Sequence, residues 1–335
     1  TLYLMAHPEG LRNYNPEPPS ARRLDLVISQ ECAGLRLDQA LARLLPELSR
    51  SRLQTWIREE RVTVQGVPAA PKTRVWGGES VRIEVKPDPR ESAFTPEAIR
   101  LDIIHEDAAL MVINKPPGLV VHPGSGNWKG TLLNALLHHA PQLAEVPRAG
   151  IVHRLDKDTS GLLVVAKTLE AQVALVRQLQ ARSVGREYLA LVLGEVPQDG
   201  KVEAPIGRHP VQRTRMAVVK SGRTAVTHYK VMERLPGCTL LLCRLETGRT
   251  HQIRVHMHAI GHPLVGDPVY GRRPKQLPPE LREATAALHR QALHAARLTL
   301  IHPARGKSVS WEAALPEDMK KILSKVRSWG KENSE

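Results

Sequence analysis

The stretch KPDPRESAFTPEA, residues 86–98, constrains the fold of this 335-residue chain more than any other feature. Its three prolines lack a backbone N–H, so neither a regular helix nor a central strand can run through it. Prolines mixed with charges are typical of linkers. The sequence therefore predicts a small unit over 23–86 and a large unit over 99–325. The segments expected to be linker or flexible are 87–98, 1–22 and 326–335.

The small unit is predicted to combine two short helices with strands. Leucines at 37, 41, 44 and 45 recur at helical spacing and indicate a first helix. Ser49 can cap a second helix, whose apolar stripe holds Leu53, Trp56 and Ile57. A short strand at 62–64, a Gln-Gly turn and the alternation over 81–85 follow. This is the pattern of a compact α/β module.

The large unit is predicted to be a mixed α+β domain with a large sheet. Buried strands are expected where apolar runs end in turn residues, at 110–113, 162–166, 188–193, 225–232 and 239–245. Helical patterns lie near 131–139, 169–181 and 250–260. Strands and helices in this irregular order favour a mixed sheet covered by helices.

The charge of the chain favours a polyanionic partner. There are 48 lysines and arginines against 34 aspartates and glutamates, a net charge of +14. The excess is concentrated over 205–260, which holds ten basic residues and two acids. Such a region favours nucleic acid before membrane. Aromatic residues are only 3% of the chain, which argues against a surface that stacks many single-stranded bases.

The cysteines and apolar runs indicate where the protein works. Cys32, Cys238 and Cys243 form neither a paired framework nor a CxxC motif, which fits a reducing cytosol and argues against structural zinc. No apolar run approaches 18 residues, and the N-terminal stretch does not resemble a signal peptide. We therefore expect a cytoplasmic protein that does not span a membrane.

The stretch HRLDKDTSG, residues 153–161, places two carboxylates beside cations directly before a buried strand. In extended chain Asp156 and Asp158 would point to the same side, about 7 Å apart. They could then hold a metal or act as a glycosidase pair, although such pairs usually come from separate elements. Either carboxylate could instead cap the following turn. The spacing alone does not decide between these interpretations.

The stretch LETGRTHQIRVH, residues 245–256, leads from a strand through a turn to a helix that Thr250 can cap. Arg249 in the turn and Arg254 in the helix would make an anion site, for a phosphate or for a buried aspartate. A metal site of His251, His256 and His258 is disfavoured, because 251 and 256 are poorly spaced for one helix face. The glycine-rich GSGNWKGT (124–131) lacks the residue order of a phosphate-binding P-loop.

Taken together, these segments resemble the RluA-type family of RNA pseudouridine synthases. The resemblance covers nearly all of 100–315, and its most specific part is HRLDKDTSG followed by TGRTHQIRVH. Within the family, the chain is most similar to the branch that acts on large-subunit ribosomal RNA. Residues 34–85 resemble the RNA-binding module named after small-subunit ribosomal protein S-four. The other matching stretches are INKPPGLVVHPG (113–124), REYLALVLG (186–194), AVTHYKV (225–231) and HPLVGDPVYG (262–271).

The resemblance implies a fold of pseudouridine-synthase type, with a mostly antiparallel sheet, and a role for each matching residue. Asp156 would be the catalytic carboxylate, acting as nucleophile or as base toward the sugar. Arg254 would keep it ionised, and Tyr188 would stack on the target uracil and assist proton removal from carbon 5. Arg154 would enter the stack as the base flips out, while Asp158 supports the loop. The remaining candidates are His153, Thr159, Arg249 and His251 for substrate binding, and Arg36, Arg50, Arg52 and Arg58 in the module.

The reaction so implied is an isomerisation without redox change, so neither cofactor nor metal is expected. The expected partner is large-subunit ribosomal RNA, free or in a pre-ribosomal particle, bound by a monomer. Two alternatives stay open: a synthase acting on transfer RNA, and a non-catalytic RNA-binding or ribosome-assembly factor. A metal-dependent RNA hydrolase using Asp156 and Asp158 is a third interpretation, and it predicts loss of activity in a chelator.

Overall fold

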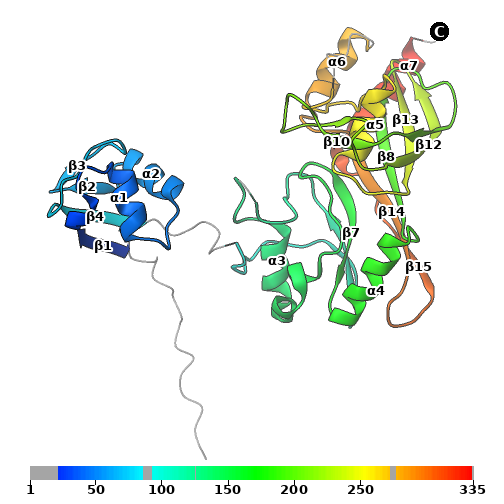
Figure 1. Cartoon of the computed structure of the whole chain (residues 1–335). Helices are drawn as coiled ribbons and strands as arrows, with labels where there is room; N and C mark the ends of the chain where they lie inside the picture. Colours follow the sequence, from blue (N-terminus) through cyan, green and yellow to red (C-terminus); the bar gives the residue numbers. More distant parts are fainter. Residues whose placement is uncertain (1–21, 86–92, 125, 272–276, 334–335) are drawn as a thin grey trace, which may run out of the picture. The chain divides into compact units, whose positions relative to one another are not determined.

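The computed structural model describes residues 22–85, 93–124, 126–271 and 277–333 (Figure 1). The chain divides into two compact units, Thr1–Glu91 and Ser92–Glu335. The predicted flexible segment 1–22 lies outside the described residues except for Arg22, and so does the first half of the predicted linker.

The small unit packs two helices on a four-stranded sheet. The helices are α1 (Leu37–Leu44) and α2 (Arg50–Arg58), after a short 3-10 turn, η1 (Gln30–Cys32). The sheet has the order β1-β4-β2-β3, with bounds Arg22–Val27, Ser80–Val85, Val62–Val64 and Val67–Pro68. The predicted cap of α2 is confirmed, because the Ser49 hydroxyl accepts a hydrogen bond from the Arg52 N–H at 3.3 Å. Strand β1 was not predicted.

The large unit is built on a nine-stranded sheet in the described residues, with the order β5-β6-β7-β14-β8-β13-β12-β9 and β15 beside β14. All pairings in it are antiparallel except that of β7 with β14. The expected mixed, mostly antiparallel sheet is thus confirmed. The bounds are β5 Ile103–Glu106, β6 Leu110–Lys115, β7 Ser160–Ala166, β8 Gly185–Leu193, β9 Gly200–Glu203, β12 Val226–Leu235, β13 Cys238–Leu245, β14 Leu293–Ile301 and β15 Ser308–Glu312. A separate hairpin consists of β10 (Ile206–Arg208) and β11 (Met216–Val218).

Helices cover both faces of the sheet at β6 and β7, which explains why these strands read as continuous apolar runs. Met111 and Leu163 point to the cluster around α3 (Leu132–His139). Their neighbours Val112 and Leu162 point to the opposite cluster, which includes α4 (Leu169–Gln180). The other helices of this unit are α5 (Gln252–Ala259), α6 (Pro279–Ala286), α7 (Glu317–Glu332) and the 3-10 turns η3 (Pro141–Glu145) and η4 (Pro147–Gly150).

Two segments expected to be flexible are packed against the large unit. The predicted tail from residue 326 is instead the end of α7 as far as Glu332, and Val326 is fully buried in a hydrophobic cluster that also holds residues of β8 and β13. In the second half of the predicted linker, the carbonyls of Ala93 and Thr95 accept hydrogen bonds from the Asn134 side chain, at 3.1 and 2.8 Å. The linker half lacks a strong local pattern, so its order comes from tertiary contacts. In α7 the apolar residues Met319, Ile322, Leu323 and Val326 recur at helical spacing, and the sequence prediction overlooked them.

The entry of the chain into β7 is fixed by a close approach to β14. Gly161 has φ +109°, and a Cβ on it would lie 2.2 Å from the carbonyl oxygen of Ala295. Only glycine fits this backbone conformation and this gap. The loop over 153–159 is thereby held against the centre of the sheet.

Candidate functional site

A pocket of about 490 Å³ is lined mainly by three sequence segments, with further residues from the end of α4 and from Leu293 of β14. The loop over 153–159 forms one wall, the start of β8 forms the floor, and the turn from β13 into α5 forms the other wall. The structure thus brings together Asp156, Tyr188 and Arg254, which are far apart in the sequence.

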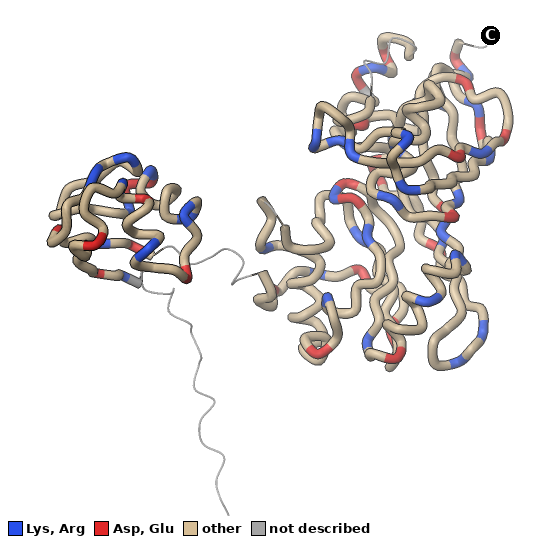
Figure 2. The backbone as a smooth tube through the Cα atoms, in the orientation of Figure 1, with Lys and Arg blue, Asp and Glu red and all other residues tan. Residues whose placement is uncertain are grey.

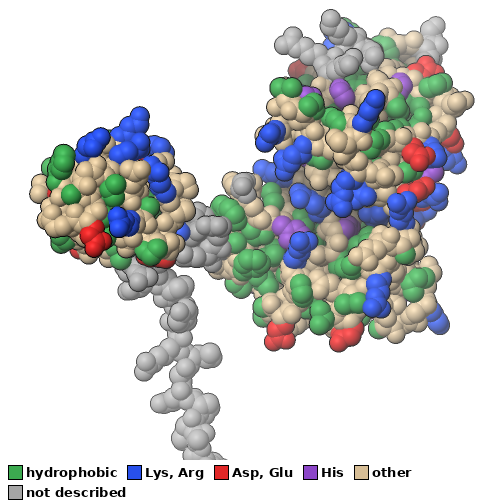
Figure 3. Space-filling view, in the orientation of Figure 1, with side chains coloured by type: hydrophobic (Ala, Val, Ile, Leu, Met, Phe, Trp, Pro, Cys, Tyr) green, Lys and Arg blue, Asp and Glu red, His purple; other side chains and the backbone are tan. Residues whose placement is uncertain are grey.

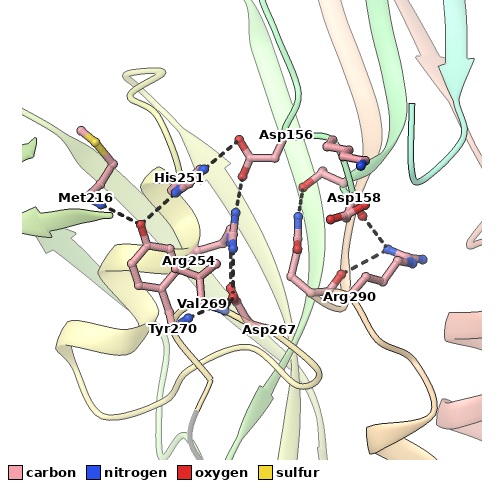
Figure 4. A network of polar contacts seen from close by, with 12 residues as sticks. Asp156, Asp158, Met216, His251, Arg254, Asp267, Val269, Tyr270 and Arg290 are labelled. Atoms are coloured by element: carbon pink, nitrogen blue, oxygen red, sulfur yellow. Dashed lines mark hydrogen bonds and ion pairs between the residues drawn. The ribbon is translucent and has the colours of Figure 1, made fainter. Parts of the chain in front are cut away.

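Asp156 and Arg254, which both line this pocket, form an ion pair (Figure 4). The Arg254 Nη1 donates to Oδ2 of Asp156 at 3.0 Å, and the Asp156 side chain is 15% exposed. The other side of the same guanidinium donates to Asp267, through Nε at 2.7 Å and Nη2 at 2.9 Å. Backbone N–H groups of Val269 and Tyr270 also donate to Asp267. Asp267 therefore fixes the guanidinium in place, and Arg254 presents one remaining edge to Asp156.

The contacts among Asp156, Arg254 and Asp267 favour the charged forms of Arg254 and Asp267 over their neutral forms. Burial opposes ionisation of Asp267, but the hydrogen bonds and charge of Arg254 outweigh it and lower the pKa of Asp267. Burial likewise opposes the charge of Arg254, and its two aspartate partners raise its pKa. One cation serves two carboxylates, so Asp156 is held and oriented but its charge is only partly compensated.

His251 lies directly before α5, and its side chain approaches the Asp156 carboxylate. It has a left-handed backbone (φ 57°) and is the N-cap residue without a side-chain cap, so the prediction that Thr250 caps this helix is wrong. The Tyr270 hydroxyl accepts from the Met216 N–H at 2.9 Å and lies 2.8 Å from Nδ1 of His251. A hydroxyl that donates to Nδ1 leaves the ring proton on Nε2, which lies 3.9 Å from Oδ1 of Asp156. Burial, followed by the charge of Arg254, lowers the pKa of His251 against the opposing effect of Asp156.

Asp158 does not share the side of Asp156. The backbone turns over residues 157–158, and the Thr159 N–H donates to the Asp156 carbonyl at 3.1 Å. Extended chain was therefore the wrong assumption, and Asp158 points away from Arg254 (Figure 4). Its carbonyl accepts from Arg290 Nη1 at 3.2 Å. This geometry does not make the two carboxylates a metal clamp or a glycosidase pair.

Lys115 is a supporting residue that sequence reasoning missed. Its side chain is fully buried, and its Nζ donates to the carbonyls of Pro116, Leu119 and Lys157 at 2.8, 2.9 and 2.8 Å. Lys115 thereby connects the end of β6 to the loop over 153–159 that carries Asp156, called the carboxylate loop below. Burial lowers the pKa of Lys115 to about 7, against the opposing effect of Asp158 and Asp156. The available signal was a lysine between an apolar run and Pro-Pro-Gly.

The other predicted substrate-binding residues have different surroundings. Arg154 is exposed at the pocket, and Arg249 lines it while its Nε donates to the Thr224 carbonyl at 3.0 Å. His153 Nε2 accepts from the Val164 N–H at 3.1 Å; burial, with a contribution from Arg186, lowers its pKa to about 3. Thr159 is buried and accepts from the Gln291 amide at 3.0 Å. The last two shape the loop through bonds within the protein.

In the small unit, the predicted RNA-binding arginines partly serve the fold. Arg36 and Arg50 pair with the buried Asp38 at 3.0 and 2.9 Å, and their own side chains remain 37% and 46% exposed. Arg52 lies over the Trp56 ring at 4.9 Å, and Arg58 donates to Gln54 at 3.4 Å. Figure 2 shows where lysines and arginines lie along the backbone, and Figure 3 shows their side chains gathered on parts of the visible face of both units.

Two groups of histidines contain residue types that can bind a metal. His256 is buried with Nδ1 next to Thr227 Oγ1 and Nε2 next to the Ala204 carbonyl, so both ring nitrogens are engaged. That arrangement leaves no free lone pair for the metal site with His251 and His258 that the sequence disfavoured.

A second group, His105, Asp107 and His302, brings its ligand atoms within 4.8 Å of one another. However, His302 Nδ1 accepts the N–H groups of Ala304 and Arg305, both at 3.2 Å, so its proton lies on Nε2 and points to Asp107 at 2.8 Å. A metal at Nε2 would force the proton onto Nδ1, against two donors. This group fits a hydrogen-bonded loop anchor better than a metal site.

The chain is similar to known proteins in both of its units. Residues 109–259 match the family model of RNA pseudouridylate synthase, and residues 35–81 match the S4 domain. A relative from Nitrosomonas europaea, named ribosomal large subunit pseudouridine synthase D, is 57% identical over 95% of this chain and 94% of its own length. The Escherichia coli K12 protein of the same name is 52% identical over 91% of this chain and 95% of its own.

Solved structures show the same likeness. The human RNA pseudouridylate synthase domain containing 4 matches with a TM-score of 0.54 and 26% identity, over 67% of this chain and 92% of that one. The human domain containing 1 protein matches with a TM-score of 0.51 and 25% identity, over 69% of this chain and 96% of that one. None of the helices in the described ranges is both long and apolar enough to cross a bilayer.

Proposed function

This chain belongs to the RNA pseudouridylate synthase family, and from that premise we propose that it isomerises uridine to pseudouridine in large-subunit ribosomal RNA through Asp156. The relatives named for this activity match the chain over more than nine-tenths of its length. The observation that carries the assignment of the site is the Asp156–Arg254 ion pair at 3.0 Å inside a pocket of about 490 Å³.

The reaction requires one reactive carboxylate. Asp156 attacks carbon 1′ of the ribose, or removes a proton from the sugar, and in either route the bond from carbon 1′ to nitrogen 1 breaks with its electron pair on the base. The uracil turns and carbon 5 bonds to carbon 1′, while the bond from Asp156 to carbon 1′ breaks or, in the other route, the proton returns to the sugar. The hydrogen of carbon 5 leaves as a proton and nitrogen 1 takes up a proton, so the product is an isomer of the substrate. Oxidation state is unchanged, so the balance of the reaction requires no cofactor and no metal.

The neighbours of Asp156 support this chemistry. Arg254, fixed by Asp267, pairs with the Asp156 carboxylate and limits its motion. Tyr188 is 6% exposed on the pocket floor, where its ring can stack on the uracil. Burial raises the pKa of Tyr188, with Asp156 adding to the effect and Arg186 opposing it, so its hydroxyl keeps its proton. Arg154, exposed at the pocket, is placed to enter the stack that the flipped base leaves.

The S4 domain supplies a second RNA contact. We propose that its half-exposed Arg36 and Arg50, with Arg52 and Arg58, bind folded RNA by shape and phosphate contacts while the large unit flips the uridine. We also propose that the enzyme is a cytoplasmic monomer that meets its RNA free or in a pre-ribosomal particle.

The test uses large-subunit ribosomal RNA transcribed with uridine tritiated at carbon 5, mixed with the protein in a chelator. Tritium release and mapped pseudouridines are expected, because carbon 5 must lose its hydrogen. RNA cleavage that requires a metal would indicate a hydrolase. RNA binding without tritium release would indicate a non-catalytic factor. Release from transfer RNA but not from ribosomal RNA would assign a different substrate within the same family.

A further inference from the structure

The pocket contains a buried cation that the chemistry above does not use. Arg186 lies near the start of β8, is 8% exposed and lines the pocket. Its guanidinium makes no hydrogen bond or ion pair to any residue that the structure describes, and its Nε is buried without an acceptor. A guanidinium stays charged at any physiological pH, and burying it unpaired is strongly unfavourable. Within the part of the chain that the structure describes, the fold therefore holds a buried cation without a partner, in a pocket where a bound anion could pair with it.

The acids of the pocket are already engaged elsewhere. Asp156 pairs with Arg254, and Glu246 pairs with His228 and, at 3.7 Å, with Arg182. The neighbouring Glu187 points to the other face of β8 and pairs with Arg297 at 3.3 Å. None of these carboxylates contacts the guanidinium of Arg186.

The sequence makes room for this guanidinium. Nη1 of Arg186 lies 2.8 Å from where a Cβ on Gly248 would be. The φ of Gly248 is not in the left-handed region, so its backbone does not require glycine. The absent side chain at 248 instead leaves the space that the guanidinium occupies.

The position of Arg186 relative to Tyr188 suggests which part of the substrate it meets. The two side chains alternate onto the same face of β8, so their Cα atoms are about 7 Å apart. If the uracil stacks on Tyr188, the phosphodiesters on either side of its nucleotide lie at a similar distance from the Tyr188 ring, within reach of Arg186. Arg182 and Arg249 line the same pocket, and burial together with the charges of Arg223 and Arg182 lowers the pKa of Arg249. Positive charge is thus dense beside Arg186, as a path for a polyanionic strand requires.

We propose that Arg186 is a substrate-binding residue that pairs with a phosphodiester flanking the target uridine and so sets the position of the flipped nucleotide. The inference rests on the proposed function. A phosphodiester is permanently charged, so it compensates the guanidinium as soon as RNA binds, with charge-assisted and often bidentate hydrogen bonds. The uracil ring is neutral before its bond breaks, and it offers no such compensation in the bound ground state.

The first test uses Arg186→Met, which keeps the length of the side chain and removes the charge. Because an unpaired buried cation is replaced by an apolar group, its melting temperature should equal or exceed that of the wild type. KM for RNA should rise roughly tenfold to hundredfold, the strength of a charge-assisted hydrogen bond, with kcat changed less than about threefold. Arg186→Lys should recover part of the loss. Gly248→Ala, which displaces the guanidinium, should raise KM in the same direction.

Arg297→Met is the matched control, since it removes an arginine of the same sheet that is 49% exposed and paired outside the pocket. Its KM should not change. The proposal is overturned if Arg186→Met melts below the wild type with KM unchanged, because the residue then only supports the fold. An effect confined to kcat also overturns it, because Arg186 would then act on the reacting base.

The second test asks whether Arg186 acts on one particular phosphodiester of the RNA. A synthetic stem-loop of large-subunit ribosomal RNA with one uridine is made with a neutral methylphosphonate at the linkage before or after that uridine. One of these linkages should raise KM for the wild type and have no further effect on Arg186→Met. Additive effects at both linkages contradict the proposal. If the wild type does not isomerise the unmodified stem-loop, the proposed function fails rather than this inference.

Discussion

Replacing Arg254 by methionine should damage both the stability and the activity of the large unit, for separate reasons. The change removes the partner of Asp156 and leaves Asp267 buried with two backbone N–H donors and no cation. Methionine fills much of the same volume, so packing is largely retained. The loss of charge compensation is therefore the main effect.

The magnitude follows from the burial of this pair. Removing one partner of a buried ion pair costs about 3–5 kcal/mol, because the remaining charge is left uncompensated. For a unit of this size that corresponds to a fall in melting temperature of about 6–20 °C. The double variant Arg254→Met with Asp267→Asn removes the stranded charge, so it should recover much of the stability but none of the turnover.

The measurement is urea unfolding followed by circular dichroism, with tritium release on the same samples. The pH dependence gives a sign check. In the wild type the pKa of Asp267 is lowered, so its stabilising ionisation is complete above its ordinary value and is lost as the pH falls below it. Without Arg254, burial alone should raise that pKa, so the stability difference should shrink from pH 7 to pH 4. A variant as stable as the wild type at pH 7 would refute the assigned geometry.

Three further substitutions are informative. Asp156→Asn should abolish tritium release while RNA affinity stays within a few-fold, and release at the wild-type rate would remove Asp156 from the chemistry. Lys115→Met should cost about 2–4 kcal/mol in urea unfolding and most of the turnover, because three loop carbonyls lose their donor. Gly161→Ala should lower the melting temperature, since its Cβ would lie 2.2 Å from the Ala295 carbonyl, at a cost of at least about 2 kcal/mol; an unchanged melting curve would contradict that close approach.

The sequence alone predicted the elements with strong local patterns. Apolar runs gave β6, β7, β8, β12 and β13, and helical spacing gave α1 to α5 nearly to their observed ends. These succeed because period and capping are properties of neighbouring residues. The helical spacing of the apolar residues in α7 was overlooked, and weakly patterned elements such as β1 and β14 were missed. Their order depends on what they pack against, which no local window contains.

The site divides along the same line. The carboxylate loop and the segment with Arg254 could be singled out, because their charged residues stand against buried strands and turns. The sequence determined which side chains are available for the chemistry and which local helices, strands and turns carry them. Only the tertiary structure decided that Arg254 is shared between Asp156 and Asp267, that Lys115 holds the loop, and that Arg186 is buried without a partner among the described residues. The compensation of a buried charge is set by whichever groups the fold brings within a few ångströms, at sequence separations that propensity does not reach.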